Sequence, residues 1–241
     1  MTEPLAPSVA TPAERRLLAP VRHTVILIAI LFAIAAYGVY GQHVAAQTPP
    51  PASRGSTLPL YLALLVAEWA LVRYVMVGLR KGGTPFREIL GRRWTGWKDV
   101  LRDVAIALAV FAIWTAGSGV VDHFTRAQTA KAVENMLPRG VAEIAVWILL
   151  SLSAGFCEEV VYRGYLQRQF HALTGSGIAA VALQAVIFGI SHGYQGVRNM
   201  LFITVYGALF GALALWRRSL KPGMILHAWT DIFGGIIQKS F

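Results

Sequence analysis

The chain has 241 residues, of which 56% are hydrophobic and only 14% are charged. A soluble domain usually carries about 25% charged residues, so this composition argues against a soluble globule and predicts a protein that crosses a membrane several times. The net charge of +10 would suggest a nucleic-acid partner in a soluble protein. Here the basic residues lie in short segments between apolar runs, as membrane topology requires, and we expect no nucleic acid.

The chain begins with a polar tail, residues 1–23, that is rich in Pro, Ala, Arg and Glu. The tail contains no early apolar run, so we do not expect it to be a cleaved signal peptide. Residues 24–140 are expected to form N-terminal transmembrane helices and a basic linker. Residues 141–241 are expected to form the core that carries the chemistry.

Seven apolar stretches reach or approach the ~20 residues that a helix needs to cross a bilayer. They predict an all-α, polytopic transmembrane helical bundle of about seven spans, with an eighth helix as an alternative. Pro and Gly interrupt the chain between these stretches, as at 48–51 and 82–85, where a helix cannot continue. The predicted spans are residues 24–41, 57–79, 103–121, 141–161, 176–192, 199–216 and 222–238.

Basic residues in the loops predict which side of the membrane each loop faces. The 80–102 linker carries seven Lys and Arg residues, whereas the 42–56 loop carries only Arg54. A second basic cluster lies at 217–221. All basic segments fall on one side if the spans alternate strictly and the chain starts in the cytoplasm. We therefore expect a multi-pass protein of the cell membrane with a cytoplasmic N-terminus.

Three polar clusters, at 158–163, 191–192 and 227–231, lie within apolar segments in the last part of the chain. A charge at membrane depth costs several kcal/mol, so such residues usually face a polar cavity and mark function. Each cluster also has a structural explanation, because a buried histidine or an acid–base pair often only fastens helices together. Their concurrence favours a functional polar site, either for catalysis or for ion or proton transfer.

The first cluster contains two adjacent acids with different predicted roles. On a helix the side chains of Glu158 and Glu159 diverge by about 100°. Glu159 and Arg163 are four residues apart on one face, where an acid that precedes a base pairs well. We therefore assign Glu159 to an ion pair with Arg163, which leaves Glu158 facing the cavity. The helix is expected to continue through about Phe170, because no helix breaker occurs before Gly164.

The other two clusters supply histidines. His192 ends an apolar run, and His227 and Asp231 share one helical face. A carboxylate and a histidine beside one water molecule can remove its proton, and the hydroxide can attack a peptide carbonyl. A second histidine with a neighbouring donor can stabilise the negative oxygen that develops. These are the parts of a protease that uses no covalent nucleophile, and we interpret Cys157, the only cysteine, as a packing residue.

Two weaker patterns have alternative interpretations. Glu68 and Arg73 in the second span predict either a structural pair or a cavity lining. Gly207 and Gly211 form a GxxxG pattern that allows close helix approach. Internal packing explains this pattern at least as well as dimerisation does.

Taken together, the three clusters resemble the motifs of the CPBP intramembrane protease family. This family includes the type II CAAX prenyl endopeptidases and the bacteriocin-immunity proteins of the Abi group. The resemblance covers about residues 141–238, and Glu159 and Arg163 match the supporting positions of the family. The three motifs are, in chain order, Glu158-Glu159-x-x-x-Arg163, Phe188-x-x-x-His192 and His227-x-x-x-Asp231.

The resemblance implies an intramembrane endopeptidase with four catalytic residues. It assigns the activation of water to Glu158 and His192, and the stabilisation of the oxyanion to His227 and Asp231. Eukaryotic members tend to carry Asn at the position of Asp231. An ionised aspartate repels a developing negative charge, so Asp231 would act either as a protonated donor or as the residue that orients His227.

Members of the family have also been called metalloproteases. Glu158, His192 and His227 could supply the three ligands of a catalytic zinc site. The contiguous H-E-x-x-H motif of common zinc proteases is absent from the sequence. We therefore expect glutamate-driven hydrolysis without a cofactor, with zinc as the alternative.

The expected substrate is a membrane-associated peptide or protein, and the lipid bilayer is the other expected partner. The resemblance adds a prenylated CAAX peptide as a narrower substrate class. Two alternative functions use the same residues. One is a non-catalytic immunity or scaffold protein that binds a membrane peptide, and the other is a proton-coupled transporter.

Overall fold

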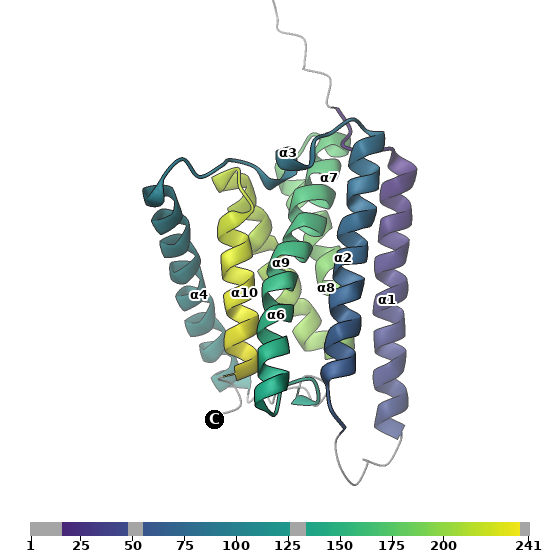
Figure 1. Cartoon of the computed structure of the whole chain (residues 1–241), viewed down its shortest axis with the longest axis vertical. Helices are drawn as coiled ribbons and strands as arrows, with labels where there is room; N and C mark the ends of the chain where they lie inside the picture. Colours follow the sequence, from purple (N-terminus) through teal and green to yellow (C-terminus); the bar gives the residue numbers. More distant parts are fainter. Residues whose placement is uncertain (1–15, 48–54, 126–133, 237–241) are drawn as a thin grey trace, which may run out of the picture.

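The computed structural model describes residues 16–47, 55–125 and 134–236, and the regular elements in these ranges are helices. The long helices lie side by side and alternate in direction (Figure 1). The predicted all-α transmembrane bundle is confirmed. Most of the polar tail lies outside the described residues, and the division of the chain into three parts stays a prediction.

Each predicted span coincides with one helix, but two of these helices are short. Helices α8 and α10 have 15 and 16 residues, so they rise only about 22–24 Å against a hydrocarbon core of about 30 Å. Among the described residues, five helices are long and apolar enough to cross a membrane. Within the described residues, five long helices and two shorter ones thus occupy the seven predicted positions, and the number of membrane crossings stays a prediction. The seven helices are α1 (Val21–Gln47), α2 (Leu58–Lys81), α4 (Trp97–Thr125), α6 (Val141–Glu158), α8 (Gly177–Ser191), α9 (Val197–Arg217) and α10 (Lys221–Ile236).

One helical run of 34 residues, Val141–Thr174, forms the centre of the bundle. It consists of α6, a π-helical segment (Glu159–Leu166) and α7 (Gln167–Thr174). The run passes Phe170, as predicted. It ends at Gly175, whose φ of 73° is the left-handed conformation that glycine adopts easily after a helix.

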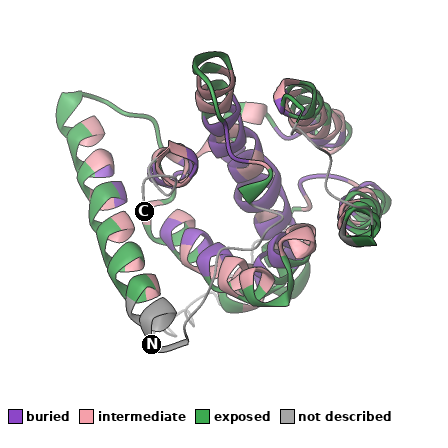
Figure 2. Ribbon diagram, turned by 90° about the horizontal axis from the view of Figure 1, so that it is seen from below, coloured by how far each residue is buried: buried purple, intermediate pink, exposed green. Residues whose placement is uncertain are grey.

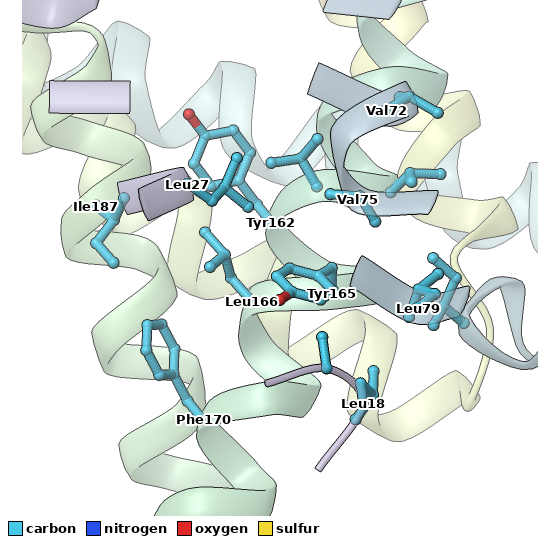
Figure 3. Packing of buried hydrophobic residues seen from close by; sticks show 14 of the residues in the cluster. Leu18, Leu27, Val72, Val75, Leu79, Tyr162, Tyr165, Leu166, Phe170 and Ile187 are labelled. Carbon is cyan, nitrogen blue, oxygen red and sulfur yellow. The ribbon is translucent and has the colours of Figure 1, made fainter. Parts of the chain in front are cut away.

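All eight side chains of the π-helical segment are buried. Its wider turn interrupts the α-helical pattern where the central run passes through the core, and such interruptions are frequent at functional sites. Figure 3 shows Tyr162, Tyr165 and Leu166 of this segment among apolar side chains of the neighbouring helices. The labelled neighbours in this cluster are Leu18, Leu27, Val72, Val75, Leu79, Phe170 and Ile187.

The outer helices present apolar side chains to their surroundings. Figure 2 shows buried positions concentrated in the central helices, whereas α4 at the left is exposed along most of its length. Ile113 on α4, for example, is 73% exposed. Such a surface would be unfavourable in water and is expected for a helix that faces lipid.

Gly207 and Gly211 serve packing inside the bundle. The carbonyl of Gly207 accepts hydrogen bonds from Arg163 Nη2 at 3.2 Å and from Gln184 Nε2 at 2.9 Å. A Cβ atom at Gly211 would lie 2.6 Å from Gln184 Nε2 and 2.7 Å from Gln167 Oε1. These glycines therefore let α9 approach its neighbours within the chain, which favours the packing interpretation of the GxxxG pattern over dimerisation.

The basic segments gather at one end of the bundle. The start of α1, the end of α2, the short helix α3 (Phe86–Leu90) and α7 all lie at the top of Figure 1. Backbone hydrogen bonds fasten the 80–102 linker to the turn before α10, since Arg92 N donates to Arg218 O at 2.8 Å and Leu220 N donates to Leu90 O at 3.2 Å. The predicted alternation of the spans is thus present, while the side of the membrane that this end faces stays a prediction.

Gly155 sets the distance between α6 and α10. A Cβ atom there would lie 2.8 Å from Met224 O and 2.9 Å from Ala228 Cβ. We expect Gly155→Val to overpack this contact and lower the free energy of unfolding by about 1–3 kcal/mol. The loss is measured as a lower Tm of the detergent-solubilised protein. Gly117→Val on α4 is the matched control, because a Cβ atom there has no neighbour within 4 Å, and equal Tm changes in both variants would contradict the prediction.

Candidate active site

The three motifs are carried by three separate elements. Glu158 ends α6 and Glu159 begins the π-helical segment, while His227 and Asp231 lie on α10. His192 follows directly after the last residue of α8. Because α8 and α10 both pack against the central run, residues that are far apart in sequence border one interior region.

Glu159 and Arg163 form the predicted ion pair. Arg163 Nη1 donates to Glu159 Oε1 at 2.8 Å, and both side chains are completely buried. The guanidinium carbon lies 4.2 Å from the ring centroid of Phe188 and 4.9 Å from that of Phe210. Aromatic faces attract a cation in this arrangement, so the arginine is held by its acid and by two rings.

The imidazole of His227 lies among three carboxylates. Its Nδ1 is 3.3 Å from Glu159 Oε1, and its Nε2 is 3.6 Å from Glu158 Oε2 and 3.7 Å from Asp231 Oδ2. The Glu158 and Asp231 side chains are 24% and 35% exposed, whereas that of Glu159 is fully buried. The two adjacent glutamates therefore have the predicted division, with Glu159 buried against Arg163 and Glu158 open to the cavity.

His192 is held by its own helix. Its Nδ1 lies 2.9 Å from the carbonyl oxygen of Phe188. A carbonyl only accepts, so Nδ1 must donate, and in a neutral imidazole Nε2 is then left as an acceptor. The Phe188 ring centroid is 4.8 Å from the His192 ring and 6.1 Å from the His227 ring. The two histidines therefore share this phenyl ring as a neighbour.

Two cavities meet at His192. The smaller, about 140 Å³, is bordered by Glu68, Glu158, His192 and Tyr194. The larger, about 360 Å³, is bordered by His192, His227 and Asp231. Either volume can hold water, and its walls offer several polar groups to bind it. The four residues that sequence reasoning named as catalytic all line one or both cavities.

Glu68 is a polar residue of this region for which the sequence left two interpretations open. Its Oε2 accepts a hydrogen bond from Ser153 Oγ at 2.6 Å, and its side chain lines the smaller cavity. Within the described residues no ion pair joins Glu68 to Arg73, so the pairing interpretation is wrong and the cavity interpretation is confirmed. The only sequence feature that pointed to Glu68 was a carboxylate within an apolar span. Nothing in the sequence shows that α2 packs on α6.

Several hydrogen bonds fix the elements that carry the site. Tyr162 OH donates to Ser191 Oγ at 2.9 Å and ties the π-helical segment to the end of α8. Trp147 Nε1 donates to the backbone oxygen of Asp231 at 2.9 Å and ties α6 to α10. These contacts limit relative movement of the three motif-bearing elements.

The choice between hydrolysis without a cofactor and the zinc alternative stays a prediction. Catalytic zinc requires its ligands at about 2.0–2.2 Å from one ion. In the part of the chain that the structure describes, no three His, Cys, Asp or Glu side chains are grouped in this way. Cys157 is buried with its Sγ 3.7 Å from Ser153 Oγ, in keeping with a packing residue.

A comparison with known protein families finds a match in the part of the chain that carries the three motifs. Residues 140–233 match the family model described as "Type II CAAX prenyl endopeptidase Rce1-like". This segment is similar to that family. It contains all three motifs, so the family resemblance seen in the sequence is confirmed. No curated protein and no solved structure matches the chain.

The buried ion pair is expected to be the electrostatic interaction on which stability depends most. Glu159→Gln removes one charge at nearly constant volume and leaves Arg163 unpaired, which costs about 3–5 kcal/mol. Arg102→Gln breaks an exposed pair with Asp99 at 2.7 Å and should cost below about 1 kcal/mol. Denaturation of both variants in detergent measures the difference. Comparable losses of unfolding free energy in the two variants would show that the buried pair stabilises the protein no more than the exposed pair does.

Proposed function

We propose that the protein is an intramembrane endopeptidase that hydrolyses a peptide bond with water activated by Glu158 and His192. The observation that carries this proposal is the position of Glu158, a carboxylate at membrane depth that opens on the same cavity as His192. The match to a protease family supports peptide hydrolysis as the reaction. An ionisable residue inside a membrane protein is in general a sign of function.

In the proposed mechanism a water molecule binds between Glu158 and His192. His192 Nε2 orients it, since Nδ1 is engaged by the Phe188 carbonyl. Glu158 takes one proton as the water oxygen bonds to the carbonyl carbon of the substrate. The same carboxyl group then returns the proton to the amide nitrogen, the C–N bond breaks, and the amine leaves.

His227 is proposed to stabilise the oxyanion of the tetrahedral intermediate. When both ring nitrogens carry protons, Nδ1 donates to Glu159 and Nε2 faces the cavity, where it can donate to a developing negative oxygen. The Arg163–Glu159 ion pair holds Nδ1 in place. The 3.7 Å approach of Asp231 to His227 Nε2 supports an orienting role for Asp231, because an ionised aspartate would oppose the oxyanion directly.

The substrate is proposed to be a membrane-associated peptide that enters the larger cavity. The family description supports a prenylated CAAX-type peptide as the narrower form of this proposal. We place the basic end of the bundle in the cytoplasm, because cytoplasmic loops carry an excess of Lys and Arg. The protein would then be a multi-pass component of the cell membrane with its N-terminus in the cytoplasm.

Glu158→Gln is expected to lower the cleavage rate about 100- to 10,000-fold, the usual contribution of a general acid–base group. The assay uses proteoliposomes with a library of membrane peptides and detects new termini by mass spectrometry. Glu88→Gln changes an exposed acid on α3, outside the cavities that border the site, and should retain the wild-type rate. A folded Glu158→Gln variant with wild-type cleavage would refute the mechanism.

Hydrolysis is expected to continue without a bound metal. Purified protein is treated with a chelator, its residual metal is quantified, and its cleavage rate is compared with that of untreated protein. We expect the two rates to agree, because Glu158 and His192 activate water by proton transfer. Loss of activity that only added zinc restores would instead establish the zinc mechanism.

A further inference from the structure

A separate cavity lies at the basic end of the bundle. Its volume is about 440 Å³, and it lies between α7, the turn that joins α9 to α10, and the segment before α1. None of the four proposed catalytic residues borders it. Five cationic or titratable side chains line it, namely Arg16, Arg163, Arg168, His171 and Arg218.

Arg163 is paired with Glu159, but the other three arginines that line this cavity are not neutralised. Arg16 Nη2 donates to the Gly82 carbonyl at 2.6 Å, and Arg168 Nη1 donates to the Glu88 carbonyl at 2.8 Å. The Glu88 carboxylate attracts Arg168 from a greater distance. Over the described ranges, no carboxylate lies within ion-pair distance of Arg16, Arg168 or Arg218. Arg217, the residue before Arg218, is different, because its guanidinium binds Asp103 at 2.8 Å.

Two buried polar side chains also border the cavity and have unsatisfied atoms. Arg163 and Gln167 are 1% and 2% exposed, and both line it. Arg163 Nε and Gln167 Oε1 have no hydrogen-bond partner. A buried donor or acceptor without a partner is costly and calls for a ligand or water. An ordinary solvated basic surface has no such buried groups.

The backbone places Arg218 at the mouth of the cavity in an unusual conformation. Its φ of 50° and ψ of 37° are left-handed, at the position after α9 where glycine is usually found. Among the described residues it is the only one besides glycine with positive φ. Such conformations in other residues persist where the surrounding structure imposes them, and they cluster at ligand-binding sites. Here the Arg92 amide holds the Arg218 carbonyl.

We propose that this cavity binds the phosphate group of an anionic phospholipid. Guanidinium groups match phosphate oxygens in charge and geometry, and basic pockets between membrane helices bind lipid headgroups. The volume falls in the usual range for ligand pockets, about 300–1,000 Å³. Leu18, Leu215 and Leu220 also line the cavity and offer apolar contact to the glycerol and the first acyl carbons. A free phosphate ion shares the anionic chemistry but has no apolar part to use these residues.

The test measures binding of phosphatidylglycerol to the full chain in detergent by native mass spectrometry, with phosphatidylcholine as the neutral comparison. The key variant is Arg218→Gly, which removes a charge and also relieves the left-handed backbone. We expect about fivefold weaker phosphatidylglycerol binding with a Tm no lower than that of the wild type. Adding Arg168→Gln should weaken binding about 25-fold in total, if each arginine contributes about fivefold.

The matched control is Arg87→Gln with Arg93→Gln, which removes two exposed charges from the same end but outside the cavity. It should change binding less than twofold. Equal losses of lipid binding in the two double variants, or equal binding of both lipids by the wild type, would overturn the proposal.

Binding of inorganic phosphate is the third measurement, and a site that binds phosphate as tightly as the lipid would overturn the assignment to a phospholipid. Binding is measured without any cleavage assay, so this result is independent of the proposed protease activity.

Discussion

The interior of this protein is organised by one buried charge pair. Within a membrane, an unpaired charge in the core would cost several kcal/mol, so Glu159 and Arg163 have to remain together. Arg163 reaches from the π-helical segment to the carbonyl of Gly207 on α9, and Glu159 reaches His227 on α10. The pair thus links three elements, and the packing of Phe188 and Phe210 on the guanidinium fixes its position.

This pair also explains how two neighbouring glutamates acquire different properties. Glu159 makes structural contacts on both sides, with Arg163 on one side and the imidazole of His227 on the other. Glu158 is one position earlier, at the end of α6, and points to the cavity instead. The structural acid holds the histidine that the proposed mechanism needs for the oxyanion. Glu158 stays accessible to water, and a general base needs this access.

The sequence predicted the features that depend on local spacing. The ion pair followed from the four-residue separation of Glu159 and Arg163, and the long central helix followed from the absence of helix breakers. The sequence could not decide whether Glu68 pairs with Arg73 or lines the cavity, because its position depends on how α2 packs against α6. It also could not show the basic cavity, which is assembled from segments more than 100 residues apart, such as those that carry Arg16 and Arg168.

The lengths of two predicted spans could not be read from the sequence for a related reason. Hydropathy marks α8 and α10 as membrane segments, but their lengths are set by breaks at Gly193–Gln195 and at the turn that precedes Lys221. Those breaks were visible in the sequence only as loop signals. How far each helix reaches across the bilayer is decided by where neighbouring elements hold its ends.

The shortness of α8 has a consequence for the surrounding lipid. A 15-residue helix is several ångströms too short for a typical hydrocarbon layer, and such hydrophobic mismatch is relieved when the bilayer thins beside it. His192 stands at the end of α8, so thinning there would lie next to the proposed water-activating residues. It would shorten the path from the aqueous phase to the cavity, and the proposed hydrolysis would gain a route for its water through the lipid boundary.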